Sequence, residues 1–121
     1  MNFFNFFLRL IPASKQSIRG LRFALDDMAF VQQIVLFVIA ISLLIFLPIS
    51  IELKLFILFS HTLLLIVELL NTAVEKTIDR ISLDFNELSK KVKDMASAAV
   101  FIALLLALTF WVIAMYQLLV R

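Results

Sequence analysis

Hydrophobic residues are concentrated in three long runs along the chain. The first extends from Met28 to Ile51 and the last from Met95 to Val120, and neither contains a charged residue. The middle run starts near Leu55 and must continue to about residue 74 to cross a bilayer, although it then includes polar side chains. A run of about 18 or more apolar residues is typical of a transmembrane helix. We therefore expect three spans, near residues 31–51, 55–74 and 96–118.

The segment that precedes the first run has a mixed pattern. Phenylalanine dominates residues 3–8, and Lys15, Arg19 and Arg22 follow at i, i+4 and i+7, on one face of a helix. We interpret this segment as an amphipathic helix at the membrane interface, started or broken at Pro12. The apolar patch precedes the positive charges, which is the reverse of the order in a cleavable signal peptide.

Composition supports a membrane protein and excludes several kinds of site. The 121 residues make one domain at most, and 64% of them are hydrophobic, which is too large a share for a soluble fold of this size. Cysteine is absent, which excludes disulfides and thiolate metal sites, and the single glycine, Gly20, excludes Gly-rich nucleotide loops. We predict one all-α domain over residues 1–121, with residues 1–30 interfacial. A short turn made by Pro48, Glu52 and Lys54 should join the first two spans.

Lysine and arginine are distributed unequally between the two sides of the membrane. The amino-terminal segment contains four of them and the segment between the second and third spans contains five. Only Lys54 and Arg121 fall on the opposite side. By the positive-inside rule, the amino terminus and the second loop are therefore cytoplasmic.

A polar stripe leaves the second run towards the cytoplasm. Glu68, Asn71, Glu75 and Asp79 stand at i, i+3, i+7 and i+11, so they share one helical face. A carboxylate in hydrocarbon costs several kcal/mol, which makes Glu68 a candidate functional residue. Because three spans enclose few polar groups, we expect an oligomer that keeps Glu68 and Asn71 away from lipid. Small residues that favour close helix packing recur in the third span at Ala96, Ala99, Ala103 and Ala107.

Residues near the cytoplasmic boundary have the chemistry that phosphoryl transfer requires. Mg²⁺ in such sites is held by one or two carboxylates together with the phosphates, and cations contact the phosphate oxygens. Asp27 and Glu75 lie near the boundary as candidate ligands, and Lys93 stands beside Asp94 as a candidate phosphate contact. The pattern therefore favours a magnesium nucleotide site on the cytoplasmic side.

The deeper part of the stripe has the residues for proton transfer. Glu68 lies in apolar surroundings, where a carboxylate is a plausible base for an acceptor hydroxyl, and Asn71 follows one turn later to orient it. Other interpretations stay open for the flanking residues. Glu75 could belong to a solvated helix end with ion pairs, and Lys90 could simply contact anionic lipid. His61, seven residues before Glu68, is interpreted as an interhelical hydrogen-bonding residue rather than a ligand.

Five segments together resemble the signature of the small integral-membrane bacterial diacylglycerol kinases. They are residues 68–75 (ELLNTAVE), 78–80 (IDR), 87–89 (ELS), 93–95 (KDM) and 97–100 (SAAV). The dense part covers about a third of the chain, and three spans with an amino-terminal surface helix match the rest. The resemblance implies a homotrimer in the bacterial inner membrane whose neighbouring subunits share active sites. It implies Mg²⁺ and ATP, a membrane lipid as acceptor, and no nucleic acid.

The resemblance also assigns roles to individual residues. Glu68 takes the role of proton acceptor, with Asn71 as a second catalytic residue, and the metal ligands are Asp27 and Glu75. The expected nucleotide contacts are Arg9, Gln16, Asp27, Glu75, Asp84, Phe85, Asn86, Lys93 and Asp94. The expected lipid contacts are Arg9, Glu68, Ser97 and Trp111.

Three positions depart from the family pattern. The family usually has Glu ahead of the first span, whereas this chain has Asp26-Asp27, and the alignment from Gly20 needs one deleted residue. We choose Asp27 as the ligand, and Asp26 is the alternative. Gln16 stands where a Tyr is often found, and Asn86 where a His is common. These changes bear on nucleotide contacts and leave the reaction type as it is.

Four functions compete. The resemblance favours ATP-dependent phosphorylation of diacylglycerol to phosphatidic acid at the cytoplasmic face. Undecaprenol kinase, from the same superfamily, is the runner-up. A small proton-coupled exporter built around Glu68 is less well matched, because such exporters usually have four spans and an isolated Glu. A non-catalytic assembly protein leaves Glu68 and Asn71 unexplained.

Overall fold

The computed structural model describes residues 3–120, which contain four α-helices and no strand. The helices are α1 (Phe3–Ala24), α2 (Met28–Phe46), α3 (Ile51–Ile81) and α4 (Glu87–Leu119). The last three are long and apolar enough to span a membrane. The all-helical, multi-pass architecture expected from the hydrophobic runs is therefore confirmed.

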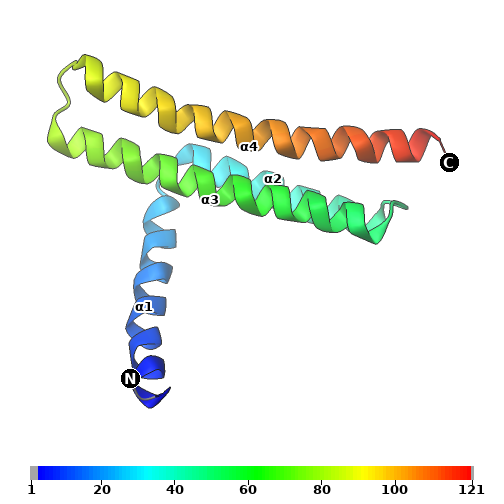
Figure 1. Cartoon of the computed structure of the whole chain (residues 1–121), viewed down its shortest axis with the longest axis horizontal. Helices are drawn as coiled ribbons and strands as arrows, with labels where there is room; N and C mark the ends of the chain where they lie inside the picture. The colour runs from blue at the N-terminus through cyan, green and yellow to red at the C-terminus, as the bar shows by residue number, and fades with distance from the viewer. Residues whose placement is uncertain (1–2, 121) are drawn as a thin grey trace.

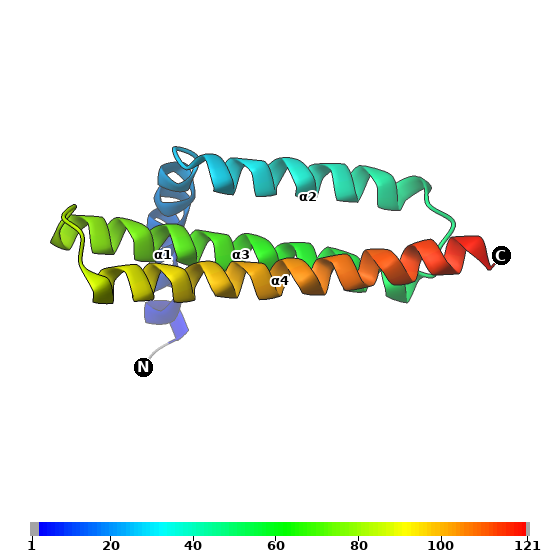
Figure 2. The same ribbon diagram turned by 90° about the horizontal axis from the view of Figure 1, so that it is seen from above.

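Helices α2, α3 and α4 lie side by side, and α1 runs crosswise to them (Figures 1 and 2). The 22 residues of α1 make a rod of about 33 Å at 1.5 Å per residue. All of its residues are exposed except Ala24, where it meets the bundle. Pro12 lies inside α1 and does not break it, so the expectation of a break or start at this proline was wrong. The helix loses one backbone hydrogen bond at Pro12 and continues on both sides of it.

The connection between α2 and α3 is shorter than the sequence suggested. Helix α2 ends at Phe46, Leu47 adopts the extended conformation that a following proline favours, and Ser50 caps α3 by accepting a hydrogen bond from the Leu53 N–H at 3.3 Å. Glu52 and Lys54 therefore lie in the first turns of α3, and their assignment to the turn was wrong. The side chain of Gln117 in α4 accepts a hydrogen bond from the Ser50 N–H at 3.1 Å, which fastens this connection to the third span.

The core of the bundle is small and lies towards the end opposite to α1. Leu44, Ile49, Leu53 and Ile57 pack there against Ala114 of α4. The buried residues of α4 are all alanines, namely Ala103, Ala107 and Ala114, which lets α3 and α4 approach closely. The earlier part of the expected alanine stripe differs, because Ala99 is exposed. Most other apolar side chains of the spans face outwards, as expected for helices surrounded by lipid or further subunits.

Helices α3 and α4 extend past the level at which α1 crosses the bundle (Figure 1). Helix α3 continues to Ile81, and α4 starts at Glu87 with Asn86 as its N-cap, whose Oδ1 accepts from the Ser89 N–H at 3.1 Å. Most of the polar segment between the second and third spans is thus helical, and only residues 82–86 connect the two helices. The fold consequently holds two polar regions, one beside the junction of α1 and α2 and one at the α3–α4 tip.

Candidate functional site: an intramembrane acidic cluster below a nucleotide-sized hollow

The side chain of Asp27 is held in place by the start of α2. It is the N-cap of α2, and its Oδ1 accepts hydrogen bonds from the backbone N–H groups of Ala29 at 3.0 Å and Phe30 at 3.2 Å. Capping by aspartate is a local consequence of sequence, since the residue precedes an apolar helix that begins at Met28. Both bonds end on Oδ1, so Oδ2 stays available to a ligand. Asp26, the alternative metal ligand, is exposed and caps nothing.

Glu68 lies on the face of α3 that packs within the bundle. Only 4% of its surface is exposed, and its carboxyl interacts electrostatically with those of Asp27 and Glu75. The chain thus buries Glu68 without a second subunit. The expectation that only an oligomer would keep Glu68 from lipid was wrong.

Asn71 connects the two glutamates. Its Nδ2 donates to Glu75 Oε1 over 3.4 Å, and its side chain also interacts with Glu68. Its Oδ1 is buried and has no hydrogen-bond partner among residues 3–120. A buried amide oxygen without a partner costs free energy, so this atom is suited to accept a hydrogen bond from a bound molecule. Asp27, Glu68, Asn71 and Glu75 are called the acidic cluster below.

The acidic cluster fits the way in which Mg²⁺ is usually bound. Residues 3–120 contain no group of three or more His, Cys, Asp or Glu side chains arranged to hold a metal. Mg²⁺ does not need such a cage, because it commonly uses one or two carboxylates together with substrate phosphates and water. Asp27 and Glu75 supply two carboxylates, both of which interact electrostatically with Glu68. The donor set is therefore suited to a cation that arrives with a nucleotide.

The tip of the α3–α4 hairpin contains a hollow of about 430 Å³. All five hairpin residues expected to contact nucleotide line it: Asp84, Phe85, Asn86, Lys93 and Asp94. Asp79, Ser82 and Lys90 line it as well. Phe85 is 84% exposed, so its ring is free to stack on a base. The structure thus brings the predicted nucleotide residues of this segment into one place.

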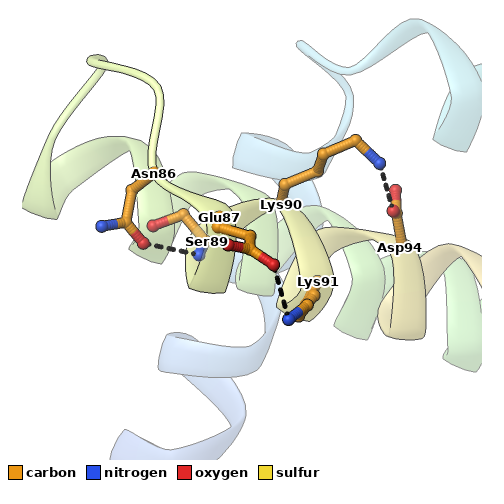
Figure 3. A network of polar contacts seen from close by, with 6 residues as sticks. All are labelled: Asn86, Glu87, Ser89, Lys90, Lys91 and Asp94. Atoms are coloured by element: carbon orange, nitrogen blue, oxygen red, sulfur yellow. Dashed lines mark hydrogen bonds and ion pairs between the residues drawn. The ribbon is translucent and has the colours of Figure 1, made fainter.

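The lysines of this hollow are already paired with carboxylates. Lys93 Nζ lies 2.5 Å from Asp79 Oδ1 across the hairpin, and Lys90 Nζ lies 2.7 Å from Asp94 Oδ2. Figure 3 shows the Lys90–Asp94 pair and a second pair one turn away, Lys91–Glu87 at 2.8 Å. All of these side chains are well exposed, so each pair contributes little to stability and can be exchanged for a phosphate.

The remaining predicted site residues are spread over the chain. Arg9 and Gln16 lie on exposed faces of α1, away from the hairpin hollow, and Ser97 is exposed on α4. Trp111 lies further along α4, where its Nε1 donates to His61 Nε2 at 2.9 Å. The interpretation of His61 as an interhelical hydrogen-bonding residue is confirmed. A single chain does not bring all of the predicted contacts to one site.

The sequence analysis missed one ion-pair partner and two buried polar residues of the spans. Asp79 was placed on the stripe but not recognised as the partner of Lys93. Thr72 Oγ1 and Gln33 Oε1 are buried without a hydrogen-bond partner in the described part of the chain. The signal for both was present, since each is a polar residue inside an apolar run and such residues are costly unless they are used.

Comparison with known proteins identifies the family of this chain. The sequence profile of the family described as "Prokaryotic diacylglycerol kinase" matches residues 15–115. A protein of Escherichia coli named diacylglycerol kinase is 38% identical over 112 residues, covering 92% of each chain. Proteins of the same name from Pseudomonas aeruginosa and Haemophilus influenzae are each 39% identical over 104 residues, which cover 85% and 84% of this chain. The chain belongs to the prokaryotic diacylglycerol kinase family.

Proposed function

We propose that this protein transfers the γ-phosphoryl group of ATP to the free hydroxyl of diacylglycerol, forming phosphatidic acid and ADP. Membership in a lipid kinase family and the name of its relatives support the reaction. The observation that supports the proposal is the acidic cluster, in which Glu68 is buried and interacts with Asp27 and Glu75. Helix α3 continues from this cluster into the hairpin that projects from the bundle (Figure 1). A lipid hydroxyl and a soluble nucleotide can approach the cluster from opposite directions.

Glu68 is the proposed general base. As the oxygen of the lipid hydroxyl forms a bond to the γ-phosphorus, its proton passes to the Glu68 carboxylate. The bond between the γ-phosphorus and the β–γ bridging oxygen breaks, and ADP leaves. Asn71, whose side chain interacts with Glu68 from one turn away, would hold the Glu68 carboxylate in register. Positioning of this kind accounts for most of the catalysis in phosphoryl transfer.

Asp27 and Glu75 are the proposed ligands of Mg²⁺. When bound with the nucleotide, the cation would neutralise charge on the phosphate oxygens. Lys93 and Lys90 would contact phosphate after releasing Asp79 and Asp94, and Phe85 would contact the base.

A homotrimer with shared sites is proposed for the assembly. By the resemblance, Arg9 and Ser97 match functional positions of the family and Gln16 stands where a Tyr is often found, yet all three side chains lie on exposed faces of their own chain. A neighbouring subunit that packs against the exposed apolar faces of the spans would bring such residues to the cluster. The amphipathic α1 would then lie on the cytoplasmic surface of the bacterial inner membrane.

The orientation can be tested directly because the chain contains no cysteine. Single cysteines introduced at Lys54 and Asn86 should react with a membrane-impermeant thiol reagent from opposite sides of sealed vesicles. The amino terminus and Asn86 are expected on the cytoplasmic side. Reaction of both cysteines from the same side would overturn the proposed orientation.

The substrate is tested by an assay in mixed detergent micelles. Purified protein receives magnesium ATP labelled in the γ position and either diacylglycerol or undecaprenol, and labelled lipid phosphate is measured. We expect rapid labelling of diacylglycerol and much slower labelling of undecaprenol, with both rates lowered by at least about a hundredfold in Glu68→Gln. The reverse preference would assign the chain to undecaprenol kinases. Labelling of neither lipid by a folded protein would contradict the proposal.

A further inference from the structure

Thr72 differs from the other threonines of this chain. The sequence contains four threonines, and all of them lie in helices. Thr62, Thr77 and Thr109 are exposed, and each hydroxyl donates a hydrogen bond to the backbone carbonyl four residues earlier, at 2.7 to 2.9 Å. Thr72 is only 4% exposed, and its Oγ1 is buried with no hydrogen-bond partner among residues 3–120. The one buried threonine is therefore the one whose hydroxyl is unpaired.

The backbone carbonyl that Thr72 leaves unused belongs to Glu68. A helical threonine commonly donates its hydroxyl proton to the carbonyl four residues earlier, and for Thr72 that residue is the proposed base. The bond is absent although both residues lie inside the continuous helix α3. A buried hydroxyl without a partner costs free energy in the free chain. The hydroxyl of Thr72 is thus suited to bind a group that comes from outside the chain.

The position of Thr72 on α3 lies between the proposed base and a proposed metal ligand. Glu68, Thr72 and Glu75 stand at i, i+4 and i+7, so they share one face of the helix. Along the helix axis, Thr72 is about 6 Å from Glu68 and about 4.5 Å from Glu75, at 1.5 Å per residue. Thr72 also lines a hollow of about 510 Å³, so a bound molecule can reach it. A phosphoryl group that moves from a metal-bound nucleotide to a hydroxyl at Glu68 passes through this interval.

The charges around this interval call for a hydrogen-bond donor. The transferring phosphoryl group carries negative charge on its three equatorial oxygens, and the carboxylates of Asp27, Glu68 and Glu75 repel that charge. Asn71 Nδ2 already donates to Glu75, and Asn71 Oδ1 can only accept. The hydroxyl of Thr72 therefore adds a donor on a helix face that otherwise presents carboxylate oxygens.

We infer that the Thr72 hydroxyl donates a hydrogen bond to a non-bridging oxygen of the γ-phosphoryl group during its transfer. Thr72 is then a further catalytic residue of the kinase reaction, which rests on the function proposed above. The hydroxyl keeps its proton throughout, so the bonds that form and break are those of the phosphoryl transfer itself. A hydrogen bond to a charged group that is made in the transition state accelerates the reaction by about ten- to a hundredfold.

The test compares three variants of the full-length protein. Thr72→Val removes the hydroxyl and keeps the branched shape, whereas Thr72→Ser keeps the hydroxyl. Thr77→Val is the matched control, because the Thr77 hydroxyl is exposed and bonds only to Ala73 O of its own helix. Turnover is measured with magnesium ATP and diacylglycerol in mixed micelles. Titration calorimetry then measures the affinity for magnesium ADP with and without aluminium fluoride, which takes the place of the transferring phosphoryl group.

We expect Thr72→Val to lower kcat by about ten- to a hundredfold while the KM values for ATP and diacylglycerol stay unchanged. Its affinity for magnesium ADP with aluminium fluoride should fall by a similar factor, and its affinity for magnesium ADP alone should not. Thr72→Ser should restore most of both losses, and Thr77→Val should match the parent. The thermal stability of Thr72→Val should not fall, because a methyl group replaces an unpaired buried hydroxyl.

Three results would overturn the inference. The first is a near-parental kcat in Thr72→Val. The second is an equal loss in Thr72→Val and Thr72→Ser, since the shape of the side chain and not its hydroxyl would then matter. The third is an equal loss of ADP affinity with and without aluminium fluoride. A parent protein that phosphorylates no lipid would instead contradict the proposed function, and the affinity for the aluminium fluoride complex would still decide the role of Thr72.

Discussion

The two polar regions of this protein handle charge in opposite ways. In the acidic cluster, Glu68 is buried against Asp27 and Glu75 with no cation among its interaction partners. In the α3–α4 hairpin, every acidic side chain that faces a lysine is paired with it, in exposed contacts. The first arrangement is costly in the free chain and is relieved by a cation or a proton. The second costs little and can exchange a carboxylate for a phosphate. The contrast suggests that one region performs the chemistry and the other binds the nucleotide.

The largest effect is expected at Glu68. Glu68→Gln keeps the shape of the side chain but cannot accept the proton, so turnover should fall by about a hundred- to ten-thousand-fold. The affinity for magnesium ATP should change little, because the hairpin contacts remain. Turnover is measured with diacylglycerol in mixed micelles and nucleotide affinity by fluorescent-analogue displacement.

The same variant distinguishes a base from a merely buried carboxylate. Replacing a buried carboxylate by a neutral amide removes repulsion within the acidic cluster, so a structural role predicts retained activity and equal or greater resistance to thermal unfolding. Near-normal turnover in Glu68→Gln would therefore show that Glu68 is not the base. The chemistry could then no longer be assigned to the acidic cluster.

The metal ligands should give the next largest effect. Glu75→Gln and Asp27→Asn each remove one anionic oxygen, and we expect the magnesium concentration for half-maximal activity to rise by at least about tenfold. Asparagine caps helices as well as aspartate does, so Asp27→Asn should leave α2 intact. Asp26→Asn is the matched control, because Asp26 is exposed and adjacent. A larger increase in this magnesium concentration for the Asp26 variant than for the Asp27 variant would identify Asp26, and not Asp27, as the metal ligand.

A substitution in the α3–α4 hairpin should have a smaller effect, and it tests whether this region binds the nucleotide. Asp79→Asn frees Lys93 from its ion pair, and because that pair is half exposed, its loss should lower the KM for ATP by only a few-fold. Glu87→Gln is the control, since it frees Lys91, which does not line the hollow. A large loss of activity in Asp79→Asn would mean that Asp79 itself serves the reaction and does not merely hold Lys93.

Properties set by local sequence could be predicted, and properties set by helix register could not. The three spans followed from runs of apolar residues, and the Lys90–Asp94 pair follows from an i, i+4 spacing. The Lys93–Asp79 pair joins residues 14 apart across a hairpin, so it depends on how α3 and α4 align. The burial of Glu68 depends likewise on which face of α3 meets α2. Hydropathy alone placed Glu68 at membrane depth but left open what covers it.

Helix ends show the same division. Asp27, Ser50 and Asn86 are N-caps with hydrogen bonds to backbone N–H groups two or three residues later. Their residue types are strong cap signals, and attention to Ser50 would have moved Glu52 and Lys54 from the turn into α3. Counting apolar residues finds the part of a helix that crosses the bilayer, whereas caps locate its ends. The α3–α4 hairpin extends beyond the apolar runs, so its helix ends could be located only from the caps.

The smallest effect concerns the hydrogen bond between His61 and Trp111, which joins residues 50 apart on α3 and α4. It lies in the spans, away from both polar regions, so we expect it to stabilise the helix pair without contributing to chemistry. Hydrogen bonds between membrane helices average about 0.6 kcal/mol in measured cases. His61→Phe leaves the indole N–H without an acceptor and should lower the free energy of unfolding by about that amount, whereas His61→Gln can retain an acceptor and should lose less. Thr62→Val is the control, because the Thr62 hydroxyl is exposed and bonds only to its own helix at Leu58 O. Unfolding in increasing fractions of denaturing detergent measures the difference in stability.

A different outcome would contradict this structural role. If His61→Phe instead abolished turnover at full stability, Trp111 would belong to the lipid site, as its match to the family predicts. The His61–Trp111 pair would then have to be counted among the catalytic polar groups and not among the structural ones.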